Sequence, residues 1–243
     1  ELVAPDGNVV ATKSETVEMA AGVKSMKKNI TFDALSSLLA WTSETPNLYT
    51  VIVRQKDAAG NEEMVFSTKY GFRTIEIKNG VVLINGQRVY FKGVNTQDTH
   101  PLYGRTMDVA TMLKDIELMK RANVNLVRTS HYPRAAKMYA MFDYYGLYTM
   151  DEADLECHAN TSISSWSSWA PAFADRTRRM TLRDRNHPAV IFWSLGNESG
   201  DGSNFTAAYN AVRELDDRLI HNEGQGSWNH TDMTSNMYPT LSI

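Results

Sequence analysis

The sequence has little cysteine, little excess charge and no long hydrophobic run. Its single cysteine, Cys157, excludes a disulfide within the chain and leaves the redox compartment open. No apolar run approaches the roughly 20 residues of a membrane span, and the N-terminus lacks the pattern of a signal peptide. The formal net charge of -3 gives no reason to expect nucleic acid or an anionic membrane as a partner.

The chain also lacks an initial methionine, because it begins at Glu1. We therefore expect it to be a piece of a longer protein. Its 243 residues suffice for one large or two modest domains with real cores. A hydrophobic content of 42% and a charged content of 22% are typical of a globular protein.

Residues 1–76 show the short alternating runs of an all-β domain. Residues 48–54 read as a strand, residues 57–61 as a hairpin connection with a glycine, and residues 63–70 as the returning strand. No helical pattern competes with this interpretation. An antiparallel β-sandwich is the economical prediction for residues 1–76, with its N-terminal part missing.

The pattern changes after the Asn79-Gly80 dipeptide, the strongest short hairpin signal in the chain. From there strands and helices alternate, which predicts a parallel sheet with right-handed crossovers. The expected strands are 89–95, 123–128, 147–150, 189–195, 219–223 and 233–238. The expected helices begin after Asp108, run from Pro133 to Gly146, end near Arg185 and begin at Phe205. Cations followed by Pro188 are typical of a helix C-terminus, so we interpret Arg185 and His187 as structural. A complete (β/α)8 barrel needs about 250 residues. We therefore predict that residues 77–243 form an incomplete TIM barrel that lacks its last strands.

The stretch 189–200 is the centre of this pattern. Its first residues form a strand buried on both faces, and the strand runs into Gly196, Asn197 and Glu198. In α/β barrels, catalytic groups stand at the carboxyl ends of the strands. For an isolated Asn-Glu pair, a solvated loop acid is an equally good interpretation.

Polar residues follow the other expected strands as well, and the carboxyl ends of barrel strands converge on one face. The cluster holds several carboxylates and histidines, and we find neither a Ser–His–Asp arrangement nor a phosphate-binding glycine loop in it. Such a pocket suits glycoside hydrolysis by paired carboxylates or metal-assisted hydrolysis. The set is Asn95, His100, Arg128, His131, Asp151, Glu152, Glu156, His158, Asn197, Glu198, Glu223 and Tyr238.

Glu156 and His158 are two residues apart, so in an extended segment both side chains point the same way and Cys157 points oppositely. With a third carboxylate from another strand they could hold Mg²⁺, with waters completing the octahedron. Imidazole is an unusual ligand for so hard an ion. A hydrogen-bonded Glu–His pair that organises the pocket is the alternative, and the residues alone favour it.

Several motifs stand in an order that resembles glycoside hydrolase family 2, and within it the lactose-cleaving bacterial β-galactosidases. The resemblance runs from about Trp41 to Tyr238, and its start is similar to the end of the family's immunoglobulin-like domain. The motifs are GFR at 71–73, GVN at 93–95, RTSHYP at 128–133, DE at 151–152, RDRNHP at 183–188 and WSLGNES at 193–199.

The resemblance implies roles for individual residues. Glu198 corresponds to the general acid/base, and Asn197 to the amide that contacts the region of the sugar 2-hydroxyl. Glu156, His158 and Glu198 correspond to ligands of Mg²⁺, which reverses the preference for a simple hydrogen-bonded pair; a monovalent cation is a second cofactor that the family leaves open. The remaining substrate-binding positions are His131 and His100 in the galactose pocket and Tyr238 beside the nucleophile. Asp98 and Thr99 depart from the family's version of the loop that carries His100.

The resemblance also implies that the nucleophile is a second glutamate beyond Ile243, whereas Glu223 corresponds to a structural glutamate. The expected activity is retaining hydrolysis of terminal β-D-galactosyl residues by the full-length enzyme, and we expect the 243-residue chain alone to be inactive. The family leaves open a homo-oligomeric parent and a bacterial cytoplasmic or periplasmic location. The alternatives are a β-glucuronidase of the same family, which usually lacks the Glu-x-His pair, and a non-catalytic sugar-binding protein.

Overall fold

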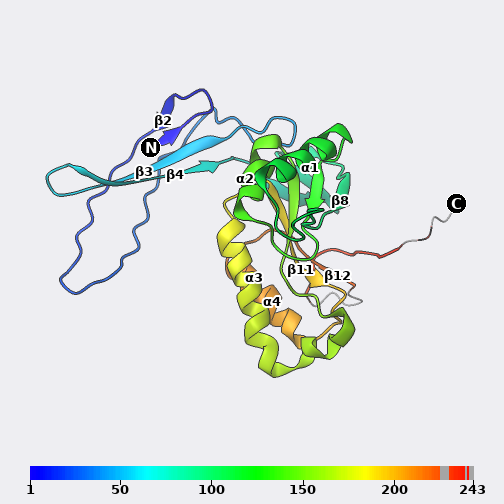
Figure 1. Ribbon diagram of the computed structural model, residues 1–243. Coiled ribbons are helices and arrows are strands. Elements are labelled where there is room, and N and C mark those ends of the chain that lie inside the picture. The colour runs from blue at the N-terminus through cyan, green and yellow to red at the C-terminus, as the bar shows by residue number, and fades with distance from the viewer. Residues whose placement is uncertain (225–229, 239, 241–243) are drawn as a thin grey trace.

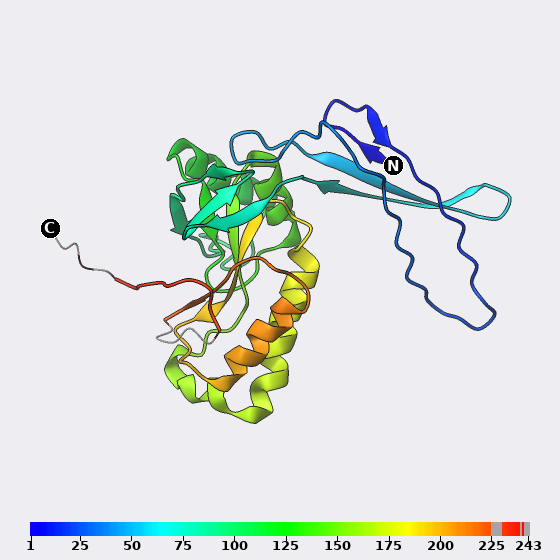
Figure 2. The same ribbon diagram turned by 180° about the vertical axis from the view of Figure 1, so that it is seen from behind.

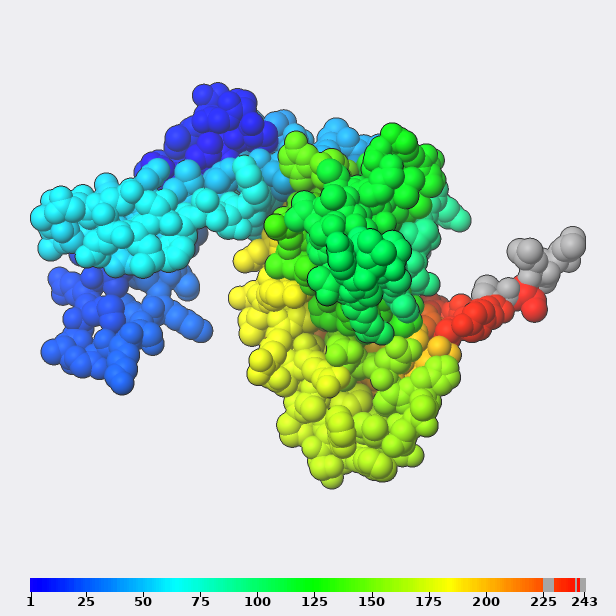
Figure 3. Space-filling model, in the orientation of Figure 1, coloured from blue at the N-terminus to red at the C-terminus, as the bar shows by residue number. Residues whose placement is uncertain are grey.

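The computed structural model describes residues 1–224, 230–238 and 240 (Figure 1). A β part at the N-terminus stands out from an α/β part that contains the buried core (Figures 1 and 3). Among the described residues, no helix combines the length and the apolar character that crossing a membrane would require.

The N-terminal part is a four-stranded antiparallel sheet with the order β2-β1-β3-β4. The β3–β4 hairpin confirms the predicted pair of strands, and Asp57 closes its turn by accepting a hydrogen bond from the Asn61 backbone N–H at 2.8 Å. All nine residues of β4 are exposed, and the four described strands form a single sheet (Figure 2). The strands are β1 (Leu2–Val3), β2 (Val9–Ala11), β3 (Tyr49–Lys56) and β4 (Glu62–Tyr70).

A small three-stranded meander follows, with β5 (Ile75–Lys78), β6 (Val81–Ile84) and β7 (Gln87–Arg88). Asn79 and Gly80 join β5 to β6 with φ angles of 52° and 74°. Positive φ at both central residues defines the two-residue turn that Asn-Gly favours. The predicted hairpin is therefore confirmed.

The α/β part has a five-stranded parallel sheet with the order β12-β11-β10-β9-β8. Each strand lies beside its neighbour in the chain, with a helix between most successive pairs. A doubly wound sheet reverses its strand order, whereas a barrel does not. The sheet is therefore an arc of a (β/α)8 barrel. Its elements are β8 (Gly93–Asn95), α1 (Val109–Arg121), β9 (Leu126–Arg128), α2 (Ala136–Tyr145), β10 (Tyr148–Glu152), α3 (Ala170–Asp184), β11 (Val190–Asn197), α4 (Ser203–Arg213) and β12 (Ile220–Glu223).

The helix ends agree with the sequence at two positions and differ at a third. Asp108 caps α1 by accepting from the Thr111 N–H, and Gly146 ends α2 in the left-handed region, both as predicted. The expected start of α2 at Pro133 is wrong, because the helix begins at Ala136. Arg134 explains the difference: its guanidinium donates to the Ser130 carbonyl at 2.9 Å and its N–H donates to the Tyr139 hydroxyl, which holds this segment against the preceding loop.

The sixth expected strand, 233–238, is also wrong. No β-ladder forms over these residues, and the backbone contact near them is one hydrogen bond from the Asp232 N–H to the Ile220 carbonyl. The side chain at the end of the segment is solvated, since Tyr238 is 86% exposed. Its alternate residues Met233, Ser235 and Met237 are only half-buried, so little holds the segment on the edge of β12.

The core surrounds β11, all eight residues of which are buried. Two contacts tie the N-terminal part to it. Arg73 donates to the carbonyls of Pro188 and Val190, each at 2.7 Å, and the Trp41 indole N–H donates to the Asp143 carbonyl at 2.9 Å. His187, which we expected to be structural, pairs with the Asp143 carboxylate at 2.5 Å.

Asp151 belongs to this core and not to the pocket, which corrects the sequence-based cluster. Its neighbour Glu152 faces the pocket, and adjacent residues of a strand point to opposite faces. Asp151 is fully buried and accepts from the Tyr139 hydroxyl at 2.5 Å. Burial, together with the nearby Asp184 carboxylate, raises the pKa of Asp151 well above its usual range.

Replacing Asp151 with asparagine should flatten the dependence of stability on pH. The raised pKa means that the folded chain holds this proton more tightly than the unfolded chain, whose aspartate titrates near 3.8. The stability that the bound proton contributes is present below that value and is lost as pH rises through the folded-state pKa. Asparagine keeps the neutral shape without a titrating proton. Melting temperatures measured from about pH 5 to about pH 9 test this, with the exposed Asp175→Asn as control; equal slopes for both variants would contradict it.

Candidate active site

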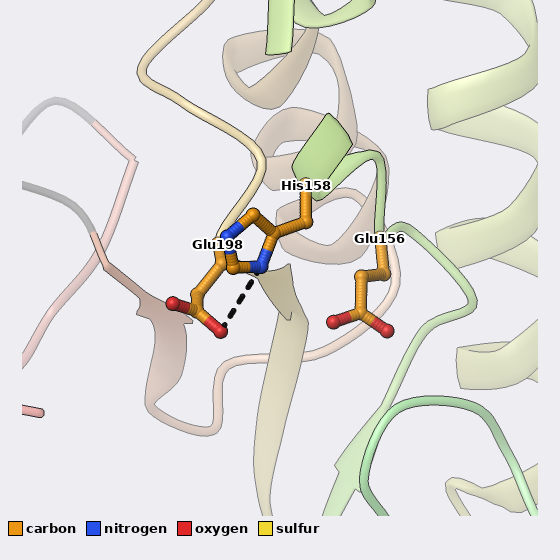
Figure 4. A group of neighbouring side chains, drawn as sticks. All are labelled: Glu156, His158 and Glu198. Atoms are coloured by element: carbon orange, nitrogen blue, oxygen red, sulfur yellow. Dashed lines mark ion pairs between the residues drawn. The ribbon is translucent and has the colours of Figure 1, made fainter. Parts of the chain in front are cut away.

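Three potential ligands gather at the carboxyl end of the sheet. Glu156 lies in the loop after β10, His158 begins the 3-10 segment η1 (His158–Ser165), and Glu198 follows β11. One donor atom from each lies within 4.8 Å of the other two, and His158 Nδ1 is 3.3 Å from Glu198 Oε2. Figure 4 shows the three side chains turned toward a shared space. The structure thus brings together the set that the sequence indicated.

The end of β11 turns two consecutive side chains into this space. In a regular strand Asn197 and Glu198 would point to opposite faces. The pairing of β11 with β12 shifts register between Ser194 and Asn197, and Glu198 has a positive φ of 43°. As a result Asn197 Nδ2 donates to Glu198 Oε2 at 3.3 Å and to Glu156 Oε1 at 3.0 Å.

Gly196 allows the loop that carries Glu156 to approach β11. A Cβ at Gly196 would lie 2.2 Å from the Leu155 carbonyl oxygen, so any other residue would push the loop away. Two hydrogen bonds hold the approach: the Asn197 N–H donates to the Leu155 carbonyl at 3.2 Å, and the Cys157 N–H donates to Ser199 Oγ at 2.7 Å. The spacing of the acidic groups therefore depends on the main chain.

Arg128 connects the floor of the site. Its guanidinium donates to Glu152 Oε2 at 2.6 Å, to Asn197 Oδ1 at 3.0 Å and to Asn95 Oδ1 at 3.3 Å. These residues come from β8, β9, β10 and β11, so one side chain fixes four strand ends. Because Asn197 Oδ1 accepts from Arg128, its amide N–H groups must face the two carboxylates.

A buried network extends from Glu152 toward β12. Glu152 also contacts His131 Nδ1 at 2.7 Å and accepts from Ser194 Oγ at 2.5 Å. Ser194 in turn lies 2.8 Å from His221 Nδ1, and His221 Nε2 lies 3.1 Å from Glu223 Oε2. The hydrogen bond from His221 lowers the pKa of Glu223 to about 2. Neither Ser194 nor His221 was identified as a site residue from the sequence. The signal that could have revealed them is a polar residue inside a buried strand, β11 for Ser194 and β12 for His221.

Two predicted substrate-binding residues lie outside these contacts. His100 Nδ1 accepts from the backbone N–H groups of Leu102 and Tyr103, and its ring stacks on Tyr103, so its interactions stay within its own loop. Tyr238 lies on the exposed C-terminal segment. The structure does bring His131 and Asn197 to the pocket, one on each side of Glu152 and Arg128.

The donor set fits a hard divalent cation. Two carboxylates and one imidazole face one another, Glu156 and His158 are exposed, and Glu198 is partly buried. An ion held there would keep several waters, which is how Mg²⁺ binds in proteins. The two carboxylate oxygens supply the ligand type that Mg²⁺ prefers, and the imidazole is the less usual member.

Comparison with known proteins gives two family matches that cover nearly the whole chain. Residues 75–242 match the TIM barrel domain of the glycosyl hydrolases family 2, and residues 1–73 match a second model of the same family. Both parts of the predicted fold class, a β-sandwich domain followed by part of a TIM barrel, are confirmed by these matches.

Solved structures of a β-glucuronidase from Ruminococcus gnavus are similar to the chain. The complex with uronic isofagomine is 26% identical with a TM-score of 0.70, and covers 76% of this chain and 34% of its own. The complex with D-glucuronic acid is 27% identical with a TM-score of 0.69, and the corresponding coverages are 76% and 33%. The chain therefore spans about a third of the length of these structures.

Proposed function

The chain belongs to the glycosyl hydrolases family 2, and from that premise we propose that it is part of a retaining β-galactosidase. Its substrates would be terminal non-reducing β-D-galactosyl residues, and Glu198 would be the general acid/base. The observation that carries the proposal is the convergence of Glu156, His158 and Glu198 beside Asn197. A panel of nitrophenyl glycosides tests the choice of sugar.

Glu198 is suited to proton transfer because its two carboxylate oxygens have different surroundings. Oε2 faces His158 and Asn197, whereas Oε1 accepts no hydrogen bond from any residue in the described part of the chain. In Figure 4 the second oxygen points away from the imidazole. Oε1 would give its proton to a glycosidic oxygen placed beside it as the glycosidic bond breaks. The deprotonated Oε1 would then take a proton from the attacking water.

The fixed groups around Glu198 would orient the sugar. The Asn197 amide is held by Arg128 and projects its N–H groups toward the pocket. If His131 donates from Nδ1 to Glu152, its Nε2 is left to accept from a sugar hydroxyl. The second carboxylate of a retaining site stands about 5 Å from the first. We assign that nucleophile to a glutamate outside residues 1–243.

We further propose that Glu156, His158 and Glu198 hold Mg²⁺. When bound, the ion would supply a positive charge that favours the ionised form of a neighbouring carboxylate. The chain's own part is to fix the ligands: Asn197 holds Glu156, and the η1 segment holds His158.

Metal removal should lower the activity of the full-length protein, and Glu156→Gln should weaken its response to added Mg²⁺. The amide keeps the size of the carboxylate but removes its charge and one strong oxygen ligand. Activity is measured against Mg²⁺ concentration after chelation, with elemental analysis of the purified protein. Asp154→Asn, a change of an exposed carboxylate in the same loop that pairs with Arg176, should leave the response unchanged. A chelated protein with full activity and no bound metal would remove this site.

A β-glucuronidase is the second candidate, because the similar solved structures are those of a β-glucuronidase. A uronate carries a carboxylate that a site must neutralise. The guanidinium of Arg128, a cation of the described site, is already paired with Glu152 and is not free to receive a uronate carboxylate. This charge distribution favours a neutral sugar.

A further inference from the structure

A side-chain bridge crosses the irregular pairing that positions Glu198. Ser194 pairs with His221 and Asn197 pairs with Glu223. Between these two pairs β11 therefore contains one residue more than β12. Such a bulge bends the strand and re-aims the side chains that follow it. His221 spans the bulge, because Nδ1 contacts Ser194 on β11 while Nε2 contacts Glu223 on its own strand.

The hydrogen-bond partners of His221 determine which of its ring nitrogens bear a proton. Ser194 has one hydroxyl proton, and it donates that proton to Glu152 Oε2 at 2.5 Å. Ser194 Oγ can then act toward His221 only as an acceptor, so Nδ1 must bear a proton. A carboxylate is an acceptor, and Glu223 Oε2 lies 3.1 Å from Nε2 while its other oxygen accepts from the Gly224 N–H, so Nε2 must bear a proton as well.

We propose that His221 is a doubly protonated imidazolium that acts as a positioning residue: it locks the bulge between β11 and β12 and thereby aims Glu198 into the pocket. The backbone gives the mechanical link, because the Glu198 N–H donates to the carbonyl of Glu223 at 3.2 Å. The catalytic consequence rests on the proposed role of Glu198, whereas the protonation state does not.

The surrounding charges are consistent with an imidazolium that is only 3% exposed. Glu223 faces it from β12, and Glu152 of β10 faces it through Ser194. Arg128 of β9 binds the far side of Glu152. His131 of the loop after β9 also contacts Glu152. Arg128 and His131 therefore face Glu152, and a protonated His221 supplies the counter-charge for Glu223.

The protonation state of His221 can be measured directly by nuclear magnetic resonance. The sample is the full-length protein labelled with ¹⁵N-histidine. At neutral pH one ring should show protons on both nitrogens, and His221→Gln should remove that signal. A His221 ring with a proton on a single nitrogen would overturn the proposal, whatever the protein's activity.

Kinetics test the positioning role. His221→Phe should lower kcat by about 10²-fold, the scale of a misplaced catalytic group, and the loss should be larger for substrates with poor leaving groups, as expected when a general acid is displaced. Ser194→Ala should reproduce the pattern in part, and adding it to His221→Phe should cost little more, because both changes break one bridge. Independent, multiplying losses would contradict the bridge.

His187→Gln is the matched control. His187 is also a largely buried histidine paired with a carboxylate, Asp143, but it precedes the opposite end of β11. It should change thermal stability without making the rate depend on the leaving group. The same leaving-group pattern in His187→Gln would show that His221 acts only through general stability. If the unaltered protein turned over no glycoside, the proposed function would fail while the resonance experiment still decided the protonation state.

Discussion

Glu198→Gln in the full-length protein should lose about 10²- to 10⁴-fold in turnover of substrates with poor leaving groups, the range of general acid–base catalysis. Glutamine keeps the contact with Asn197 in size and shape but has no proton to transfer to the glycosidic oxygen. Substrates whose leaving groups need no proton should lose much less in the glycosylation step. A series of aryl glycosides with leaving groups of graded pKa measures the difference.

Asp154→Asn serves as the control for that series, because Asp154 is an exposed carboxylate at the same end of the sheet and pairs with Arg176. Its kinetics should match those of the unaltered protein across all leaving groups. If Glu198→Gln instead lost the same factor for every substrate, Glu198 would be a binding residue and not the proton donor.

Arg128→Met should be the most destabilising single change in the site, with a loss of about 3–5 kcal/mol in the free energy of unfolding, as is usual when one partner of a buried ion pair is removed. The Arg128 side chain is 12% exposed and Glu152 is fully buried. Methionine fills a similar volume but leaves the Glu152 charge without its guanidinium and releases Asn197. Urea denaturation followed by tryptophan fluorescence measures the change, since Trp193 is buried in β11.

Arg176→Met is the matched control for this measurement. The Arg176–Asp154 pair also joins an arginine to a carboxylate, at 3.7 Å, but its side chains are 47% and 65% exposed. Exposed pairs contribute at most about 1 kcal/mol. Similar losses in the two variants would mean that the buried network around Glu152 does not hold the strand ends together.

The parts of the site that follow local rules could be predicted from the sequence. The two-residue spacing placed Glu156 and His158 on one side, and the strand into Glu198 was apparent from its continuous apolar residues. Strand alternation could also have separated Asp151 from Glu152, but both were assigned to the pocket because both end a strand.

The features that depend on distant partners could not be predicted in this way. The bulge that turns both Asn197 and Glu198 inward arises from the pairing of β11 with β12. The role of His221 depends on Ser194, which is 27 residues away in the chain. The expected strand at 233–238 had an acceptable residue pattern, but in the described structure it forms no ladder with β12 and its alternate residues are only half-buried.

The most direct test of the central claim is the ratio of kcat/KM for 4-nitrophenyl β-D-galactoside to that for the matching β-D-glucuronide, measured with the natural full-length protein in the presence of Mg²⁺. The two substrates share the leaving group, so the ratio reports only how the site discriminates a neutral sugar from an anionic one. Because the Arg128 guanidinium is already paired with Glu152 and is not free to receive a uronate, we predict a strong preference for the galactoside. A preference for the glucuronide would contradict the proposed function and place the protein with the β-glucuronidases to which its structure is similar.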